Sequence, residues 1–254
     1  MAKTLGFFMA LLSMASMAVG RGSTGWEKAF ATFYGDISGG ETMEGACGYG
    51  DLFKQGYGLD TAALSTTLFN NGHTCGACYE LKCTNNPEWC INGKTTTITA
   101  TNFCPPNWSK PSDMGGWCNP PRKHFDMAMA AFLKIVKGIK VGIVPVHYRR
   151  VKCVKKGGIK FEIKGNPYWN LVLVYNVGGV GDVKGVWVKK MGDVKSGWIQ
   201  MTRNWGQNWQ TGVGLRGWSL SFRVSVSDGR TLYALGVVPV NWNFGQSFES
   251  KVQF

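Results

Sequence analysis

The last hundred residues contain no cysteine, and the whole chain of 254 residues contains only three histidines. Because His73, His124 and His147 lack the spacing that metal ligands use, we expect no metal and no cofactor. Acidic residues are also scarce, since 15 of them against 28 basic residues give a net charge of +13. The basic residues are spread along the chain, which argues against nucleic-acid binding and favours an acidic polymer or surface.

Long apolar runs are absent after the first twenty residues. The run at residues 5–19 is shorter than the roughly 20 residues that a membrane-spanning helix needs. It follows a basic residue, Lys3, and precedes small residues, which predicts a signal peptide over residues 1–24. We therefore expect a secreted, extracellular protein with no integral membrane span and at most peripheral association with a membrane.

All eight cysteines lie between Cys47 and Cys153. An even number of cysteines in an exported chain predicts disulfides. Cys75 and Cys78 have the spacing of a redox or metal motif, but the oxidising compartment favours two structural half-cystines. Spacing alone does not decide which cysteines pair.

The cysteine-free end holds seven of the eleven tryptophans, so the composition divides the chain into two modules. In the first module, residues 95–101 and 142–154 predict strands, the latter broken at Pro145. Apolar residues from Phe125 to Val136 recur at helical spacing and predict one helix that starts after His124 and ends at Gly138.

Residues 155–158, Lys-Lys-Gly-Gly, predict a hinge or short linker between the modules. Beyond them, residues 171–175 predict a strand that is apolar on both faces, and residues 219–226 predict a half-exposed strand. Short strands at this spacing are typical of a β-sandwich.

Asp126 is the first candidate for chemistry, at the start of the predicted helix. It has two interpretations: an N-cap that accepts backbone N–H bonds, or a cleft carboxyl group whose pKa is raised by aromatic neighbours so that it donates a proton or hydrogen bond. The segment from Thr32 through Tyr34 to Asp36 is the second candidate, because small, hydroxyl and aromatic residues at a strand end line sugar sites.

Six segments in order resemble the signature of plant α-expansins: GACGYG at 45–50, CGACYEL at 75–81, TATNFCPP at 99–106, WCNPP at 117–121, HFD at 124–126 and RNWGQNW at 203–209. The resemblance covers almost all of the chain after residue 25. It implies a mainly β, two-domain fold. Residues 25–157 would form a six-stranded double-psi β-barrel related to family-45 glycoside hydrolases, and residues 158–254 an immunoglobulin-like β-sandwich that binds carbohydrate. The implied disulfides are Cys47–Cys75, Cys78–Cys153, Cys83–Cys90 and Cys104–Cys118.

The resemblance also implies a function, which is non-hydrolytic loosening and extension of plant cell walls at acidic pH. Asp126 matches the general acid of the related hydrolases, and Thr32, Tyr34 and His124 would lie with it in the cleft. Ala100 stands where some relatives carry a second aspartate. Asp36 falls near the catalytic base of the hydrolases, although an ordinary loop aspartate is the alternative interpretation. The other functions left open are a secreted endo-β-1,4-glucanase using Asp126 as acid and Asp36 as base, and a pure carbohydrate-binding protein.

Exposed aromatic rings of the second module would stack on sugar rings. Tyr168 and Trp169 follow a turn and Trp205 lies in a polar loop, so the resemblance implies that these three bind cellulose, with Lys164 and Trp198 as further candidates. We expect the remaining four tryptophans there to be core residues: Trp187, Trp209, Trp218 and Trp242. The expected partners are cellulose and xyloglucan-type matrix polysaccharides, bound by a monomer. Asn107 begins a glycosylation sequon.

Overall fold

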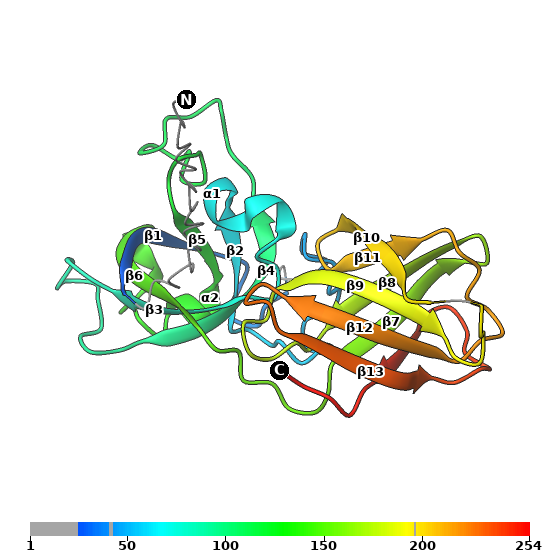
Figure 1. Ribbon diagram of the computed structural model, residues 1–254. Coiled ribbons are helices and arrows are strands. Elements are labelled where there is room, and N and C mark those ends of the chain that lie inside the picture. The colour runs from blue at the N-terminus through cyan, green and yellow to red at the C-terminus, as the bar shows by residue number, and fades with distance from the viewer. Residues whose placement is uncertain (1–24, 41–42, 196) are drawn as a thin grey trace, which may run out of the picture.

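The computed structural model describes residues 25–40, 43–195 and 197–254, which form two β modules side by side (Figure 1). The predicted signal peptide, residues 1–24, lies outside the described residues. No helix in the described part of the chain is long and apolar enough to cross a membrane.

The first module is a closed six-stranded barrel. Its strand order is β1-β5-β2-β4-β3-β6. The β1–β5 and β2–β4 pairs are parallel, and the remaining pairs are antiparallel. The strands are β1 (Glu27–Tyr34), β2 (Thr61–Ser65), β3 (Cys78–Cys83), β4 (Thr96–Cys104), β5 (His124–Ala128) and β6 (Val144–Val151).

The helix predicted after His124 is mostly wrong. Residues 124–128 form strand β5 between β1 and β2, and only a short helix, α2 (Met129–Phe132), follows it. Phe125 and Met127 alternate into the barrel core, as residues of a strand do. Phe125 also stands three and four residues before the apolar Ala128 and Met129, and that spacing gave the helical pattern. Asp126 is therefore not an N-cap, because α2 is preceded by Ala128. The other short helices are α1 (Thr66–Phe69), η1 (Asn70–Gly72) and η2 (Ile139–Val141).

The break predicted at Pro145 is also wrong, since β6 runs through it. Pro145 is the second residue of the strand and lies opposite Phe30 of β1. Its missing N–H falls where the ladder begins, a position at which strands tolerate proline. The pairing with β1 and β3 then continues along the strand.

Four disulfides cross-link the barrel module, and they join the pairs that the resemblance implied: Cys47–Cys75, Cys78–Cys153, Cys83–Cys90 and Cys104–Cys118. They fasten long loops to the strands. The described residues include no free cysteine.

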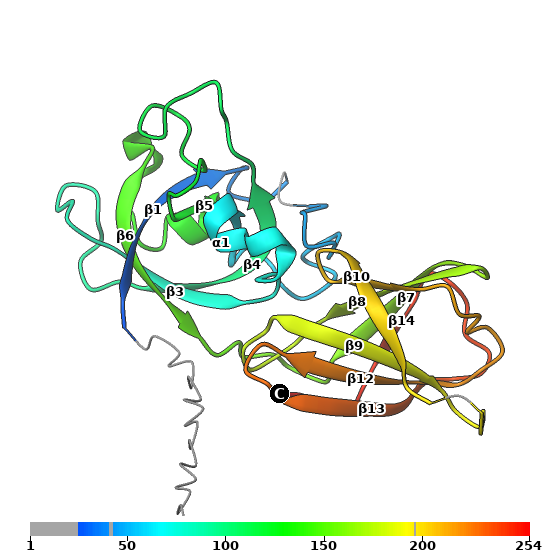
Figure 2. The same cartoon turned by 45° about the horizontal axis from the view of Figure 1, so that its top comes forward.

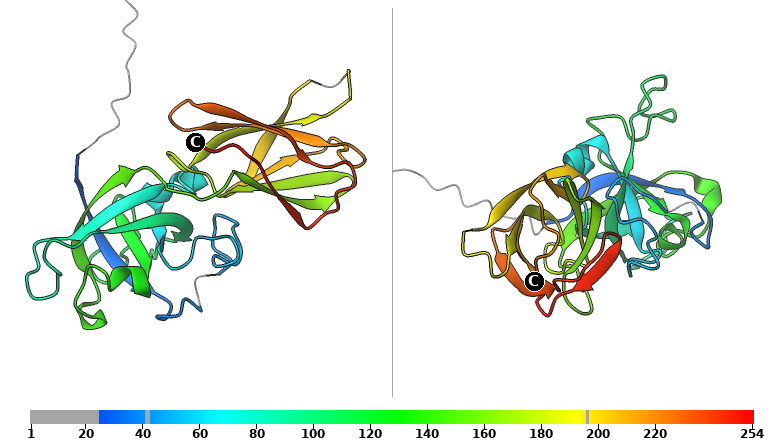
Figure 3. Two further views of the ribbon diagram at one scale, coloured as in Figure 1. Left: turned by 90° about the horizontal axis from the view of Figure 1, so that it is seen from below. Right: turned by 90° about the vertical axis from the view of Figure 1, so that its right-hand side faces the viewer.

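The second module is an eight-stranded sheet folded into two layers, with order β13-β12-β9-β10-β11-β8-β7-β14 (Figure 3). The layers meet in a single apolar core, where the rings of Phe161 and Phe222 stack with centroids 4.3 Å apart. The strands are β7 (Lys160–Asn166), β8 (Trp169–Tyr175), β9 (Val183–Lys190), β10 (Ile199–Trp205), β11 (Asn208–Thr211), β12 (Leu220–Val226), β13 (Thr231–Val238) and β14 (Gln246–Glu249).

Strand β8 is apolar on both faces because it serves two cores. Val172 and Val174 point into the sandwich core. Leu173 and Tyr175 point the other way and pack with a barrel loop that includes Tyr49, Leu52 and Tyr57. The sequence pattern is confirmed, and the reason for it is the contact between the modules.

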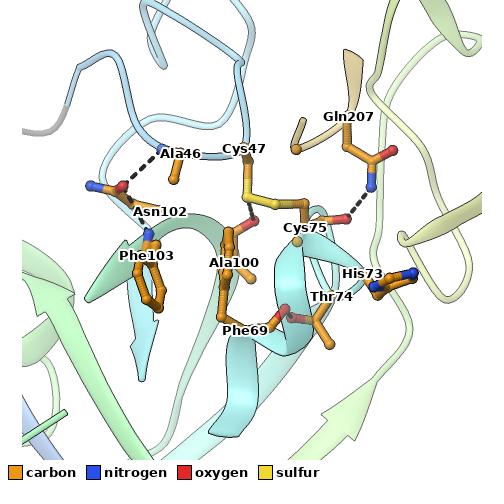
Figure 4. The surroundings of a disulfide bond; sticks show 12 residues. Ala46, Cys47, Phe69, His73, Thr74, Cys75, Ala100, Asn102, Phe103 and Gln207 are labelled. Carbon is orange, nitrogen blue, oxygen red and sulfur yellow. Dashed lines mark hydrogen bonds between the residues drawn. A yellow bond between two sulfur atoms is a disulfide. The ribbon is translucent and has the colours of Figure 1, made fainter. Parts of the chain in front are cut away.

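Polar contacts hold the same junction together. Gln207 donates from its side chain to the Cys75 carbonyl oxygen at 2.8 Å and from its backbone N–H to the Cys47 carbonyl oxygen at 2.9 Å (Figure 4 shows the side-chain bond beside the disulfide). Gly76 and Gly181 approach so closely that a Cβ on Gly76 would lie 2.6 Å from the Gly181 carbonyl oxygen. The modules are therefore seated against each other, as the turned view shows (Figure 2).

The predicted linker at residues 155–158 connects β6 to β7 beside this junction. The Lys155 ammonium lies 4.3 Å from the centre of the Tyr57 ring. Burial lowers the pKa of Lys155 to about 8. Just before the linker, Cys153 forms a β-bridge with Gly179. The linker is thus anchored at its barrel end.

Candidate functional site

Asp126 is positioned by the parallel pairing of β5 with β1. The register sets Asp126 directly opposite Thr32. The Thr32 hydroxyl donates to Asp126 Oδ1 at 2.6 Å, and the same Thr32 oxygen lies 2.8 Å from His124 Nε2. Because a hydroxyl group has one proton, His124 Nε2–H is the donor in the second bond. The three side chains form a directed chain, His124 to Thr32 to Asp126.

Burial sets the charge states of these side chains and of the neighbouring Tyr34. Desolvation raises the pKa of Asp126, and the hydrogen bond from Thr32 opposes that shift in part. Desolvation, with the positive charge of Arg122, lowers the pKa of His124 to about 3, so the imidazole is neutral at mildly acidic pH. Desolvation, reinforced by the negative charge of Asp126, raises the pKa of Tyr34 to about 12 despite hydrogen bonding that lowers it. Of these three side chains, Asp126 is therefore the one whose protonation responds to mild acid, because its pKa is raised while that of His124 is lowered and that of Tyr34 is far higher.

Asp126 lies in an open pocket of about 480 Å³. Thr32 and Phe33 form one side, and Trp117 and residues 141–143 complete the lining. From the sequence, Trp117 had no predicted role beyond its place in the WCNPP segment. A tryptophan within a cysteine-containing loop could have indicated a wall of the cleft.

Asp36 and Ala100 supply no second acid to this pocket. Asp36 is exposed, and its Oδ1 accepts from the backbone N–H and hydroxyl of Ser38 and from the N–H of Gly40. These bonds lower the pKa of Asp36, the Ser38 hydroxyl contributing most. Ala100 is fully buried in the barrel core. The lining of the Asp126 pocket contains neither residue.

On the sandwich, three predicted ring residues are exposed on or beside the layer nearest the barrel. The exposed fractions are 88% for Tyr168, 39% for Trp169 and 47% for Trp205. Asn166 Oδ1 accepts from the backbone N–H groups of Tyr168 and Trp169 and so fixes the turn that presents them. Lys164 lies on the preceding strand and pairs with Glu162 at 3.4 Å.

Gln210 connects these rings with neighbouring polar groups, and sequence reasoning missed it. Trp169 Nε1 donates to Gln210 Oε1 at 3.2 Å, and Asn204 Nδ2 donates to the same oxygen. Gln210 pairs with Leu171 of β8, so it emerges on the outer face of the layer. Successive side chains of a strand point to opposite faces, so the prediction that Trp209 points into the core could also have predicted that Gln210 points outward.

Trp205 lies at the junction between the modules. A Cβ on Gly48 of the barrel would be 3.0 Å from two carbons of the Trp205 ring. Gly48 also adopts φ +83°, a conformation that glycine tolerates best. The barrel backbone thus approaches the ring closely, and Trp205 joins the two modules' surfaces.

Trp198 does not belong to the face that carries Trp169. Its ring packs on Tyr233, with centroids 5.6 Å apart, over the other layer of the sandwich. Trp187, predicted to be a core residue, is likewise only partly buried and lies on the outer side of that layer, because its neighbours Val186 and Val188 fill the core. Trp209 and Trp242 are buried as predicted, and Trp218 packs against the core.

Comparison with known proteins agrees with this arrangement. The family model of the expansin C-terminal domain matches residues 159–239, and one described as lytic transglycolase matches residues 61–148. Expansin-A22 of Arabidopsis thaliana is 62% identical over 231 residues, which are 91% of this chain and 80% of that protein. Expansin-A13 of rice, Oryza sativa subsp. japonica, is 52% identical over 252 residues, covering 96% and 95%.

Solved structures show the same fold at low identity. The apo crystal structure of the Clavibacter michiganensis expansin has a TM-score of 0.65 and 17% identity, and the match covers 90% of this chain and 97% of that one. A mutant of that expansin, solved in complex with cellohexaose, matches with the same TM-score and 16% identity. The barrel, the sandwich and the level of identity to plant relatives together show that this chain belongs to the expansin family, in its A (α) branch.

Proposed function

We propose that this chain loosens plant cell walls by exchanging glucan–glucan contacts for protein–glucan contacts, without hydrolysing the polymer. The exposed rings of Tyr168, Trp169 and Trp205 would hold cellulose, and the Asp126 pocket would engage a glucan strand. Each hydrogen bond lost between glucans is nearly compensated by one to protein, so the exchange needs no covalent chemistry.

The observation that carries this proposal is the position of Trp205, an exposed ring of the sandwich that lies against the barrel. A Cβ on Gly48 of the barrel would be 3.0 Å from this ring. Asn102 of β4 holds the same barrel loop, because its Oδ1 accepts from the backbone N–H of Ala46 at 2.8 Å (Figure 4 shows this bond). The module that contains the Asp126 pocket thus adjoins one of the exposed rings, and we expect a single glucan strand to contact both.

An acid optimum follows from the burial of Asp126. The pKa of Asp126 is raised, so its carboxyl group becomes neutral at a higher pH than an exposed aspartate. The neutral form can donate a hydrogen bond to a sugar oxygen, and the ionised form cannot. We expect wall creep to fall as pH rises through the Asp126 pKa.

The hydrolytic alternative requires a second carboxylate about 6.5–9.5 Å from the acid, with water between them. Asp36 is the candidate, and its carboxylate is held by its own loop. The pure-binding alternative gives the Asp126 pocket no role. No observation in the described part of the chain specifically favours the glucanase or the pure binding protein.

Creep of heat-inactivated wall strips under load tests the proposal. Asp126→Asn keeps the size of the side chain but replaces the acidic O–H with an amide N–H, a weaker donor that does not titrate, and we expect it to lower the creep rate at pH 4.5 about tenfold. Its residual creep should not depend on pH. The matched control is Asp51→Asn, an exposed loop aspartate outside the cleft.

Two results would contradict the proposal. Wild-type creep in Asp126→Asn would remove Asp126 from the mechanism and favour pure binding. Steady release of reducing ends from soluble glucan, lost in Asp36→Asn, would favour the glucanase.

We also propose that the chain is secreted to the cell wall after removal of residues 1–24, acts as a monomer on cellulose and xyloglucan-type polymers, and divides into modules at residues 157–158. The exposed Asn107, whose Oδ1 accepts from the Ser109 hydroxyl, is the proposed glycosylation site. Mass spectrometry of the protein extracted from walls would check the mature N-terminus and the mass at Asn107.

A further inference from the structure

Trp187 was predicted to be a core residue and Trp198 a cellulose-binding residue. In the structure both lie on the outer side of the layer formed by β13, β12, β9 and β10. Trp187 is on β9, directly opposite Arg223 of β12. Arg223 is in turn directly opposite Tyr233 of β13. Trp198, just before β10, covers this row by packing on Tyr233. We call Trp187, Trp198, Arg223 and Tyr233 the Arg223 face.

Arg223 is held between the rings of this face. Its guanidinium carbon is 3.8 Å from the centre of the Trp187 ring and 5.9 Å from that of Trp198. Stacking on indole fixes the plane of a guanidinium group and leaves its edge available to hydrogen-bond acceptors. The side chain is thus oriented before any ligand arrives.

Arg223 has no acidic partner. Every ion pair among the described residues joins other groups, and Asp193, at the end of this layer, pairs with Lys190. The buried Nε of Arg223 has no hydrogen-bond partner in the described part of the chain. Because Nε is buried, a ligand would meet the two terminal nitrogens, which can bind a carboxylate through two parallel hydrogen bonds.

Apolar surface adjoins the guanidinium. Tyr233 is 48% exposed and Leu235, two residues along β13 and on the same side, is 67% exposed. A ring beside a cation suits a pyranose that carries a carboxylate. The surroundings of Trp169 differ, because Gln210 and Asn204 are neutral amides, which suit neutral hydroxyl groups, and the charge of the neighbouring Lys164 is paired with Glu162.

We propose that the Arg223 face is a second polysaccharide-binding site, specific for polymers that contain uronic acids. The Arg223 guanidinium binds the carboxylate, and Tyr233 stacks on the sugar. The Arg223 face and the exposed rings of Tyr168 and Trp169 lie on opposite sides of the sandwich core. Phe222 and Phe161 meet in that core, between the two layers. The sandwich therefore holds a neutral glucan on one side and an acidic polysaccharide on the other.

Binding of the full-length protein to unesterified oligogalacturonate, measured by isothermal titration calorimetry, tests the site. Arg223→Gln should weaken binding about tenfold, because a bidentate contact to a charged group is lost. Arg223→Lys keeps the charge but not the planar donors, so its affinity should lie between those of the wild type and of Arg223→Gln. Arg216→Gln is the matched control, since Arg216 is exposed and bonds only Asn243 Oδ1. It removes the same charge elsewhere and should change affinity less than twofold.

Two further measurements separate this site from the glucan site and from misfolding. Arg223→Gln should keep its affinity for cellulose, and Trp169→Ala should bind cellulose about tenfold more weakly while keeping oligogalacturonate binding. Methyl-esterified oligogalacturonate should bind at least tenfold more weakly than the unesterified form. Equal losses in Arg223→Gln and Arg216→Gln, or equal affinity for the two ligands, would overturn the proposal, as would a wild-type protein that binds neither.

Discussion

The barrel and the sandwich of this chain differ in how they are stabilised and in how they present polar groups. The barrel contains all four disulfides, and its candidate acid, Asp126, is partly buried and accepts a hydrogen bond from Thr32. The sandwich has no disulfide, and a continuous apolar core holds its layers together while rings project outward. A module whose long loops must shape a pocket needs cross-links, whereas a module that offers a flat face can rely on its core.

Reduction of the disulfides should produce the largest difference in stability between the two modules. Each disulfide contributes about 2–4 kcal/mol, so loss of all four should unfold the barrel. The sandwich core contains no cysteine and should persist. Limited proteolysis with dithiothreitol, followed by mass spectrometry, should yield cuts before residue 158 first. Simultaneous cleavage in both modules would show that the junction makes their stabilities inseparable.

A cavity in the sandwich core should have the next largest effect. Phe222 is fully buried and stacks on Phe161, so Phe222→Ala should cost about 3–5 kcal/mol of unfolding free energy. Chemical denaturation under oxidising conditions measures this loss. The control is Phe53→Ala, because Phe53 is half-exposed on a barrel loop and should change stability by less than about 0.5 kcal/mol.

Removal of one ring sharpens the difference between packing and binding. Trp169→Ala should weaken cellulose binding about tenfold with little change in stability, because the ring is exposed and bonds only the Gln210 side chain. Depletion of the protein by insoluble cellulose measures the affinity. Trp108→Ala removes an equally large ring, 73% exposed on the barrel, and should leave binding unchanged. Equal losses would mean that aromatic content, rather than the Trp169 surface, determines binding.

The smallest effect is expected at Asp36. Its carboxylate serves its own loop, so Asp36→Asn should change the creep rate by less than about twofold at any pH between 4 and 7. The Asp36 pKa is already lowered, and the group remains ionised across that range. A large loss of creep would instead place Asp36 in the cleft.

Much of the fold was predictable because it depends on local pattern. The strand predicted from the alternation at residues 219–226 is confirmed as β12. The β-branched run at residues 95–101 is likewise confirmed as a strand, since all but its first residue lie in β4. The disulfide pairs came from the resemblance, since spacing leaves pairing open. The prediction of a helix after His124 was wrong because Phe125, Ala128 and Met129 have helical spacing, whereas pairing with β1 and β2 places residues 124–128 in a strand.

The amino-acid sequence alone determined the mainly β class, the presence of two modules and the motifs that indicate the family, because composition and period are properties of neighbouring residues. Only the tertiary structure decided which face each ring occupies. Leu173 is buried because a barrel loop covers it, and Trp187 is partly exposed because it lies on the outer face of its layer, where the side chain of Arg223 packs on it. Burial of a strand face depends on what packs against it from distant parts of the chain, and a local pattern does not contain that information.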